Sequence, residues 1–297
     1  MKIAMIGLGD IARKAYLPVL SGVDGAELVF CTRNAETLRE LGDAYRVARR
    51  HTSVAEVVAG GADAAFVHAA TGAHPAIVTE LLEAGVPVFV DKPLAYRLED
   101  SERLVALARE RGVPLMVGFN RRYAPGLAAL RDLPRDLVIL QKNRHTRPED
   151  PRTMVYDDFI HVADTLRFLA PGAATTTSVR FRTTGDLLEH LVLELSGDGF
   201  TALGIMSRVS GQTEETCEVI GRGEKHKVLD LGEEVAFTED GEVRRRRPDW
   251  VPVGTQRGFR GACLAFLEAV GEGRLLDAGD ALETHRLCER ILDEVGR

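Results

Sequence analysis

The first seventeen residues constrain the fold more than any other stretch of the chain. The apolar run Ile3–Ile6 is typical of a short strand, and it leads directly into Gly7-Leu8-Gly9-Asp10-Ile11-Ala12, after which the apolar spacing becomes helical. A G-x-G-x-x-A sequence between a strand and a helix is the fingerprint of a dinucleotide-binding turn. Gly7 permits the tight turn, Gly9 lets the backbone approach a pyrophosphate, and Ala12 lets the helix and strand pack closely.

The start of this helix offers unpaired N–H groups to phosphates. We therefore predict that Gly7, Gly9, Asp10, Ile11 and Ala12 contact a nucleotide. The alternative is a plain strand-to-helix turn, because glycine-rich turns are common.

The end of the second predicted strand, Glu27–Cys31, bears on the choice of nucleotide. NAD-binding folds commonly carry an Asp or Glu here that accepts hydrogen bonds from the ribose 2′-OH. This chain has no acid between Leu28 and Asn34, and it has Thr32 and Arg33 instead. A hydroxyl and a guanidinium suit a 2′-phosphate, which favours NADP over NAD. The alternative is a solvated arginine in a turn.

Short apolar strands then alternate with helices. The predicted strands lie at 63–68, 86–90 and 114–117, and the predicted helices at 75–83 and 99–111. This alternation is typical of βαβ units in a parallel sheet covered on both faces. Ligands bind beyond the carboxyl ends of such strands. The loops at those ends carry Thr71, His74, Lys92 and Asn120, and we predict that these four residues contact the cofactor.

Beyond residue 121 the pattern changes. A strand is expected at 137–142, a helix at 157–169, and strands joined by tight turns from about 176 to 247. Such a succession favours an antiparallel sheet in a second domain. Two helices with apolar faces end the chain, at 259–270 and 287–295. The predicted domains are therefore residues 1–121 and 122–297.

Composition excludes several classes of protein. A net charge of -7 argues against a general affinity for nucleic acid or for anionic membranes. The basic run Arg244–Arg247 fits a solvated edge strand better than a binding patch. We find no targeting or membrane-spanning segment, and the four scattered cysteines indicate reduced core residues and no metal site. The expectation is a cytoplasmic protein.

Three motifs together resemble one known family. They are Gly7–Ala12, Val90-Asp91-Lys92-Pro93, and Asp157-Asp158-Phe159-Ile160-His161-Val162-Ala163-Asp164. In this order and separation they resemble the Gfo/Idh/MocA oxidoreductases, and most of all the MviM-like branch. The family usually has Glu where this chain has Asp91.

The resemblance implies an N-terminal Rossmann fold, with a parallel sheet and helices on both faces. It also implies a C-terminal α/β domain with a large, mostly antiparallel open sheet and an active site between the domains. The family transfers hydride between NADP (or NAD) and a hydroxyl or carbonyl carbon, so a small sugar- or polyol-like substrate is expected. A homodimer or homotetramer through the C-terminal sheet is implied as well.

The catalytic candidates are Lys92, Asp157 and His161. Oxidation of a carbinol needs a group that takes the proton, and a histidine with a pKa of about 6.5 suits either direction. Asp157 lies four residues before His161, on the same face of a helix, and can bind a substrate hydroxyl or orient the imidazole. Lys92 can stabilise developing alkoxide charge. The plain alternatives are a core histidine, a helix-capping aspartate and a solvated loop lysine.

A second class of function stays open at this point. A nucleotide-binding sensor or regulatory protein would keep the Rossmann site without turnover. The presence of Lys92, Asp157 and His161 in one chain argues against it, because a sensor has no need of all three.

Overall fold

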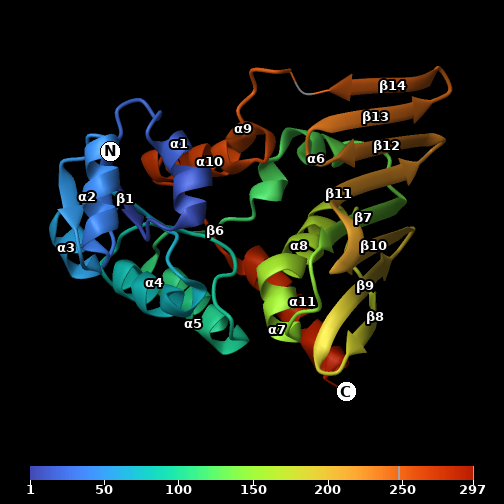
Figure 1. Cartoon of the computed structure of the whole chain (residues 1–297), viewed down its shortest axis with the longest axis horizontal. Helices are drawn as coiled ribbons and strands as arrows, with labels where there is room; N and C mark the ends of the chain where they lie inside the picture. Colours follow the sequence, from blue (N-terminus) through green and yellow to red (C-terminus); the bar gives the residue numbers. More distant parts are fainter. Residues whose placement is uncertain (247, 297) are drawn as a thin grey trace. The chain divides into compact units, whose positions relative to one another are not determined.

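The computed structural model describes residues 1–246 and 248–296 (Figure 1). Six parallel strands form a sheet in the order β3-β2-β1-β4-β5-β6. This is the strand order of a doubly wound dinucleotide-binding fold. It confirms the predicted Rossmann sheet. The strands are β1 (Lys2–Ile6), β2 (Glu27–Cys31), β3 (Arg49–His51), β4 (Ala64–Val67), β5 (Val88–Val90) and β6 (Leu115–Val117).

Helices pack against this sheet. They are η1 (Ala12–Tyr16), α1 (Leu17–Leu20), α2 (Ala35–Ala44), α3 (Val54–Ala59), η2 (Thr71–Ala73), α4 (His74–Glu83), α5 (Leu98–Arg111) and α10 (Phe259–Gly271). An aromatic cluster joins α10 to the strands. Phe266 of α10 meets the ring of Phe66 edge-on at 5.3 Å between centroids, and Phe66 stacks on Phe89 at 4.9 Å.

The chain divides into two units whose bounds differ from those of the predicted domains. Unit 1 consists of Met1–Phe119 and Phe259–Glu283, and unit 2 of Asn120–Gly258 and Thr284–Arg297. The first division lies two residues before the expected boundary at 121. The helix predicted at 259–270 was expected in the second domain, whereas its Phe266 packs into the core of unit 1. The last division falls within α11 (Gly279–Val295).

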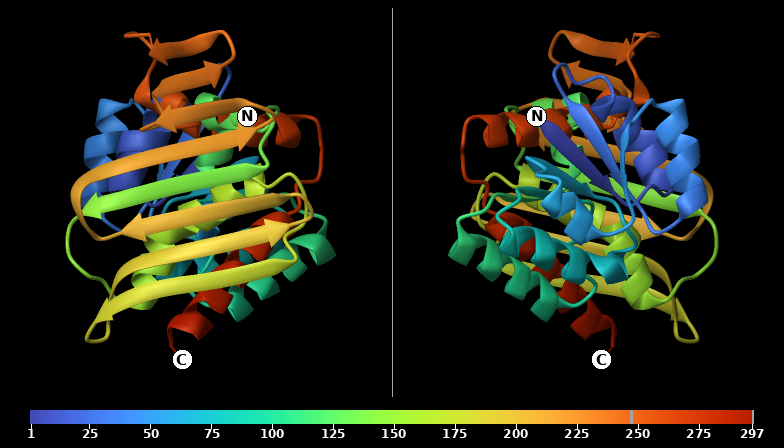
Figure 2. Two further views of the ribbon diagram at one scale, coloured as in Figure 1. Left: turned by 90° about the vertical axis from the view of Figure 1, so that its right-hand side faces the viewer. Right: turned by 90° about the vertical axis from the view of Figure 1, so that its left-hand side faces the viewer.

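Unit 2 is built on an eight-stranded sheet in the order β14-β13-β12-β11-β7-β10-β9-β8, and Figure 2 shows its strands side by side. Every neighbouring pair is antiparallel except β7 and β10. The prediction of a mostly antiparallel sheet is confirmed. The strands are β7 (Leu137–His145), β8 (Thr176–Thr184), β9 (Leu187–Gly197), β10 (Phe200–Ser207), β11 (Val209–Gly221), β12 (Glu224–Leu229), β13 (Glu233–Thr238) and β14 (Gly241–Arg246).

One face of this sheet packs on α8 (Ile160–Leu169). The alternation of β10 is as expected, with Phe200, Ala202, Gly204 and Met206 buried. Gly204 is required for the packing, because a Cβ at this position would lie 2.5 Å from Val162 Cγ1 and 2.7 Å from Leu166 Cδ1. The remaining helices of unit 2 are η3 (Asn120–Tyr123), α6 (Pro125–Leu130), α7 (Pro151–Thr153), η4 (Met154–Phe159) and α9 (Val253–Gln256).

The helix predicted at 157–169 begins six residues earlier. Helical backbone starts at Pro151, where the Asp150 side chain accepts a hydrogen bond from Thr153 N at 2.9 Å. It continues through the π-helical turn η4 into α8. The alternative that Asp157 simply caps this helix is therefore wrong, because Asp150 is the cap.

The basic run forms the edge strand β14, which ends the sheet. All six residues of β14 are exposed, and Arg244 pairs with Glu233 and Glu242. This agrees with a solvated edge strand, and Arg247 lies outside the described residues. Among the described residues, no helix has the length and apolar character needed to cross a membrane.

Candidate functional site

Unit 1 contains a pocket of about 630 Å³ at the carboxyl ends of β1 to β4. It opens where a doubly wound sheet binds its ligand. The lining residues used below are Gly7, Gly9, Thr32, Arg33, Ser53 and His68. No acidic residue is among the described residues that line it.

Gly7 and Gly9 of the fingerprint differ in why a glycine is needed. Gly7 has a φ of +88°, and a Cβ there would lie 2.6 Å from Ala69 Cα. Gly7 is therefore needed for the fold itself. A Cβ at Gly9 would meet no atom within 4 Å, so the backbone here faces open space at the pocket. This is the space that a pyrophosphate needs, and the residues present fit a dinucleotide.

Thr32 and Arg33, at the end of β2, line the pocket. Arg33 is exposed and makes no hydrogen bond or ion pair with another described residue. Three further residues line the pocket that the sequence did not predict, namely Thr37, Thr52 and Ser53. A signal existed for Ser53, because Ser53 and Glu56 form the capping box of α3, an S-x-x-E pattern at a helix start.

Other predicted cofactor residues lie beside the pocket rather than in its lining. Asp10 is exposed and pairs with Lys14 at 2.7 Å, and Ile11 is partly exposed. Ala12 is buried against the sheet, in agreement with its predicted packing role. Thr71 is half-buried and follows Ala70, which does line the pocket.

His68 lines the pocket from the end of β4 and was not among the predicted site residues. Both ring nitrogens are buried without a hydrogen-bond partner among the described residues, and the ring stacks on Tyr16 at 3.9 Å between centroids. Burial, helped by the charge of His74, lowers the pKa of His68 to about 3. His68 is therefore neutral at physiological pH.

Lys92 follows β5, and its backbone is fixed by its neighbour. Asp91 Oδ1 accepts a hydrogen bond from Lys92 N at 2.9 Å and another from the Tyr16 hydroxyl at 3.1 Å. Burial raises the pKa of Asp91, although the charge of Lys92 opposes this shift. The Lys92 side chain is half-buried, and the Lys92–Pro93 peptide bond is cis.

Two predicted cofactor residues occupy positions other than those expected. His74 is only 1% exposed, and its ring nitrogens lie 2.9 Å from Pro93 O and from Ala69 O. Its ring is thus engaged by backbone groups, and His74 is not among the described residues that line the pocket. Asn120 is also buried, and its side-chain amide donates to Arg257 O at 2.7 Å. Both side chains thus contact backbone carbonyl oxygens of the protein itself.

Asp157 and His161 lie on the continuous helix η4–α8 of unit 2. From Met154 to Leu166 they are the only two positions that are not fully buried. They are four residues apart, so the helix presents them as one accessible stripe. Asp157 belongs to the π-helical turn, a feature that is frequent at functional sites.

The third acid of the motif region has a structural role. Asp164 is 1% exposed and accepts two hydrogen bonds from Arg122, at 2.6 and 2.9 Å. Thr284 donates a third at 3.0 Å. Asp164 is therefore committed to packing and does not serve as a partner of His161.

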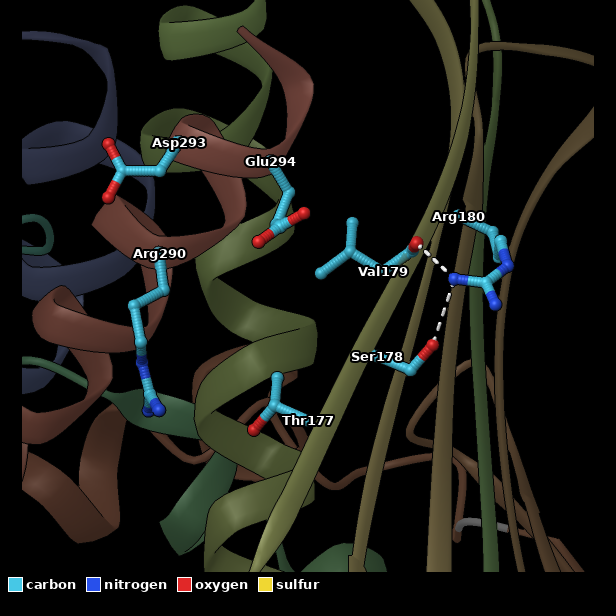
Figure 3. A pocket seen from close by; sticks show the side chains of 7 residues that line it. All are labelled: Thr177, Ser178, Val179, Arg180, Arg290, Asp293 and Glu294. Atoms are coloured by element: carbon cyan, nitrogen blue, oxygen red, sulfur yellow. Dashed lines mark hydrogen bonds between the residues drawn. The ribbon is translucent and has the colours of Figure 1, made fainter. Parts of the chain in front are cut away.

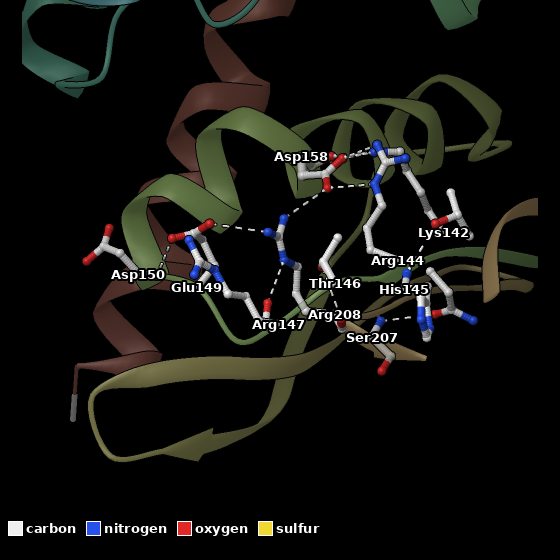
Figure 4. A network of polar contacts seen from close by, with 12 residues as sticks. Lys142, Arg144, His145, Thr146, Arg147, Glu149, Asp150, Asp158, Ser207 and Arg208 are labelled. Atoms are coloured by element: carbon white, nitrogen blue, oxygen red, sulfur yellow. Dashed lines mark hydrogen bonds and ion pairs between the residues drawn. The ribbon is translucent and has the colours of Figure 1, made fainter. Parts of the chain in front are cut away.

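A buried charge network centres on Asp158, next to Asp157 (Figure 4). Its carboxylate accepts from Lys142 Nζ, from Arg144 Nε and Nη2 at 2.9 and 2.8 Å, and from Arg208 Nη1 at 3.3 Å. Burial alone would raise the pKa of Asp158, but the hydrogen bonds and charges of Arg144 and Lys142 hold it well below its usual range.

Lys142 carries the excess charge of this network. It is 2% exposed, and burial lowers its pKa to about 7 against the attraction of Asp158. Asp158 faces three cations, and one of them, Arg208, also pairs with Glu149 at 3.2 Å. The two arginines stay charged. The network anchors the π-helical turn, and with it Asp157, to β7 and to the loop at Arg208.

A second pocket, of about 430 Å³, lies between the edge strand β8 and the end of α11 (Figure 3). Arg290, Asp293 and Glu294 of α11 face it, while the Arg180 guanidinium donates to Ser178 Oγ and Val179 O of its own strand. Charges of both signs and an open edge strand give this pocket no defined ligand chemistry. Among the described residues, no group of three or more His, Cys, Asp or Glu could hold a metal ion.

Comparison with known proteins decides the family. Residues 1–119 match the model described as an oxidoreductase family with an NAD-binding Rossmann fold, and residues 135–238 match the YceM-like C-terminal domain. YceM of Salmonella typhimurium, whose oxidoreductase assignment is provisional, is 34% identical over 100% of this chain and 97% of its own length. The chain belongs to the Gfo/Idh/MocA oxidoreductase family. The resemblance seen in the motifs is confirmed.

Solved structures and a second relative agree with this assignment. A Gfo/Idh/MocA oxidoreductase from Vibrio cholerae is 32% identical with a TM-score of 0.93, covering 100% of both chains. The MviM dehydrogenase from Clostridium difficile is 28% identical with a TM-score of 0.94, covering 99% of each. The myo-inositol dehydrogenase Hyg17 of Streptomyces leeuwenhoekii is 42% identical over 44% of this chain and 40% of its own length.

Proposed function

We propose that this family member is an NADP-preferring dehydrogenase that transfers hydride between the nicotinamide and a hydroxyl or carbonyl carbon of a small sugar- or polyol-like metabolite. The observation that carries the proposal is the accessible pair Asp157 and His161 on an otherwise buried helix. Both side chains are partly exposed there, so a substrate can reach a histidine and a carboxylate on one face of the helix.

In this proposed hydride transfer, His161, Asp157 and Lys92 each have a separate role. The nicotinamide, when bound, supplies or accepts the hydride. His161 takes the hydroxyl proton in oxidation and returns it in reduction. Asp157 binds a neighbouring hydroxyl or orients the imidazole. Lys92 donates a hydrogen bond to the reacting oxygen and stabilises its developing negative charge.

The preference for NADP is supported by the pocket. No acid among its described lining residues accepts from a ribose 2′-OH, and Arg33 is exposed without an intramolecular partner in the described chain. A guanidinium binds a phosphate through charge-assisted hydrogen bonds.

Arg33→Gln should therefore weaken NADPH binding roughly tenfold or more, the effect of losing a charge-assisted hydrogen bond of about 1.5–3 kcal/mol. The affinity for NADH should stay unchanged, since NADH has no 2′-phosphate. Nicotinamide fluorescence titrations measure both constants. Arg39→Gln, a change at an exposed arginine outside the pocket lining, is the matched control. Tight binding of NADH by the wild type would overturn the preference.

The two glycines give a matched pair of substitutions. Gly9→Ala should leave the free energy of unfolding within about 0.5 kcal/mol and weaken dinucleotide binding roughly tenfold, because its methyl group meets no protein atom. Gly7→Ala should lower the free energy of unfolding by about 2–4 kcal/mol, through its positive φ and its collision with Ala69. Thermal melts and NADPH titration read the two effects. Equal destabilisation by both changes would contradict the open cradle at Gly9.

The substrate class rests on the relatives, among them a myo-inositol dehydrogenase. A panel of sugars, polyols and keto acids, followed by the absorbance of the reduced nicotinamide, tests it directly. Turnover of any member with NADP supports the dehydrogenase. Binding of NADPH with no turnover across a broad panel would favour a sensor of the same fold.

The remaining expectations stay predictions. The four cysteines are free and buried, which supports a reducing compartment such as the cytoplasm. A homodimer or homotetramer through the eight-stranded sheet is still expected, and light scattering of the purified protein measures its mass.

A further inference from the structure

His68 lines the dinucleotide pocket of unit 1 with a ring that has no partner in the described chain. It follows β4 and is only 4% exposed, and both Nδ1 and Nε2 are buried without a hydrogen bond. Because burial lowers its pKa to about 3, the imidazole is neutral and has one donor and one acceptor nitrogen. An unpaired buried polar group is destabilising, and native proteins keep few of them. A bound ligand would supply the missing partner.

The polar side chains nearest to His68 are already engaged. The Tyr16 ring stacks on His68, and its hydroxyl donates to Asp91 Oδ1 at 3.1 Å. The two ring nitrogens of His74 each lie 2.9 Å from a backbone carbonyl oxygen. Neither side chain can pair with His68 without giving up its own contact.

Packing does not require a histidine at this position. The His68 ring stacks on Tyr16 at 3.9 Å between centroids and lies 6.2 Å from the ring of Phe66. Tyr16 in turn meets Phe89 and Phe259 edge-on, at 5.7 and 5.2 Å. A phenylalanine would complete this aromatic cluster and leave no polar atom unpaired. The ring nitrogens of His68 therefore point to a role other than packing.

The place of His68 in the sheet indicates which part of a dinucleotide it meets. β1 and β4 are neighbours, and the strand order reverses between them, so the dinucleotide crosses the sheet here. In such folds the adenosine ribose lies at the end of β2, where this chain has Thr32 and Arg33. His68 lies beyond β1 from these two residues, on the side of β5 and Lys92. The nicotinamide riboside half extends to this side.

We propose that His68 is a binding residue for the dinucleotide, and that its imidazole forms a hydrogen bond with the nicotinamide riboside half. The inference rests on the dinucleotide pocket of the proposed dehydrogenase. It depends neither on the choice between NADP and NAD nor on the substrate. No part in moving the hydride or the hydroxyl proton is assigned to His68.

His68→Phe should have opposite effects on stability and on binding. Without ligand the variant should melt about 2–4 °C above the wild type, because the ring packing stays and an unpaired polar group is removed. It should bind NADPH about tenfold more weakly, because an atom of the ligand loses its partner. The matched control is His226→Phe in unit 2, at a ring that pairs with Glu224, and it should leave NADPH binding unchanged. Wild-type affinity in folded His68→Phe would overturn the proposal.

A fragment of the dinucleotide shows which half is involved. Adenosine 2′,5′-bisphosphate contains the adenosine half of NADP but no nicotinamide riboside. In calorimetric titrations His68→Phe should bind this fragment as tightly as the wild type does, whereas Arg33→Gln should bind it more weakly. An equal loss for the fragment and for NADPH would contradict the contact with the nicotinamide half. If the wild type prefers NAD, the pair NADH and ADP gives the same comparison, so an error in the NADP preference leaves this test intact.

The imidazole of the wild type provides a test that stands even if His68→Phe fails to fold. In a long-range ¹H–¹⁵N correlation spectrum, through-space contacts to Tyr16 identify the ring of His68. NADPH should shift the resonance of one ring nitrogen, because that nitrogen gains a hydrogen bond, and adenosine 2′,5′-bisphosphate should not. Identical ring resonances with and without saturating NADPH would show that the dinucleotide is not the partner of His68.

Discussion

Replacing His161 by asparagine should lower turnover by roughly 10²–10⁴-fold, and replacing Lys92 by methionine should lower it by roughly 10²–10³-fold. In the proposed mechanism, the first change removes the group that moves the hydroxyl proton, and the second removes the donor that stabilises charge on the reacting oxygen. Both side chains are half-buried and adjoin fixed backbone, so neither change opens a cavity in a core. Steady-state kinetics with a substrate from the panel measures the loss, and NADPH titration shows that the dinucleotide still binds.

Matched changes on β12 control for these substitutions. Lys225→Met and His226→Asn remove the same side chains from the sheet of unit 2, away from the proposed reaction. They should leave kcat and the NADPH dissociation constant unchanged. Full turnover by His161→Asn or by Lys92→Met would remove that residue from the mechanism.

Asp158→Asn lowers the free energy of unfolding by about 3–5 kcal/mol, the cost of breaking a buried ion pair from one side. The carboxylate is the only anion that contacts all three of Lys142, Arg144 and Arg208 within the described network. Lys142→Met should cost far less, because two arginines still satisfy Asp158 and the excess charge disappears. Urea denaturation followed by circular dichroism measures both, with exposed Asp293→Asn as the control.

The same network predicts how stability depends on pH. The pKa of Asp158 is depressed in the folded protein, so its contribution is present above the unfolded value of about 3.9 and is lost as the pH falls towards the folded value. The pKa of Lys142 is about 7 when folded. Between that value and about 10.4 the unfolded chain binds more protons, so the free energy of unfolding rises with pH.

Lys142→Met should abolish this rise while keeping the loss of stability in acid. Denaturation midpoints across the alkaline range measure the slope. An equal slope in the variant and in the wild type would show that Lys142 does not titrate in that window.

Most of the fold was predictable from patterns of residues that are close together in the sequence. Three features depend only on neighbouring residues: the Gly7–Ala12 fingerprint, the apolar strands of unit 1 and the alternation of β10. The structure confirms all three. The three-residue strand β3, Arg49–His51, was missed because it is a short polar edge strand without an apolar pattern. The early helix start at Pro151 was missed because a cap and a π-helical turn precede the apolar spacing.

The residues of the candidate site also fall into two groups, those that the sequence predicted and those that only the folded structure revealed. The sequence by itself determined the glycine turn, the absence of an acid after β2, and the Asp157–His161 spacing, because each depends on residues close together in the chain. Only the tertiary structure decided that Asp164 and His74 are engaged internally and that Asp158 anchors the helix. Whether a polar side chain is buried and satisfied depends on partners brought in by folding, such as Arg122 for Asp164 and Lys142 for Asp158. No local pattern in the sequence specifies those partners.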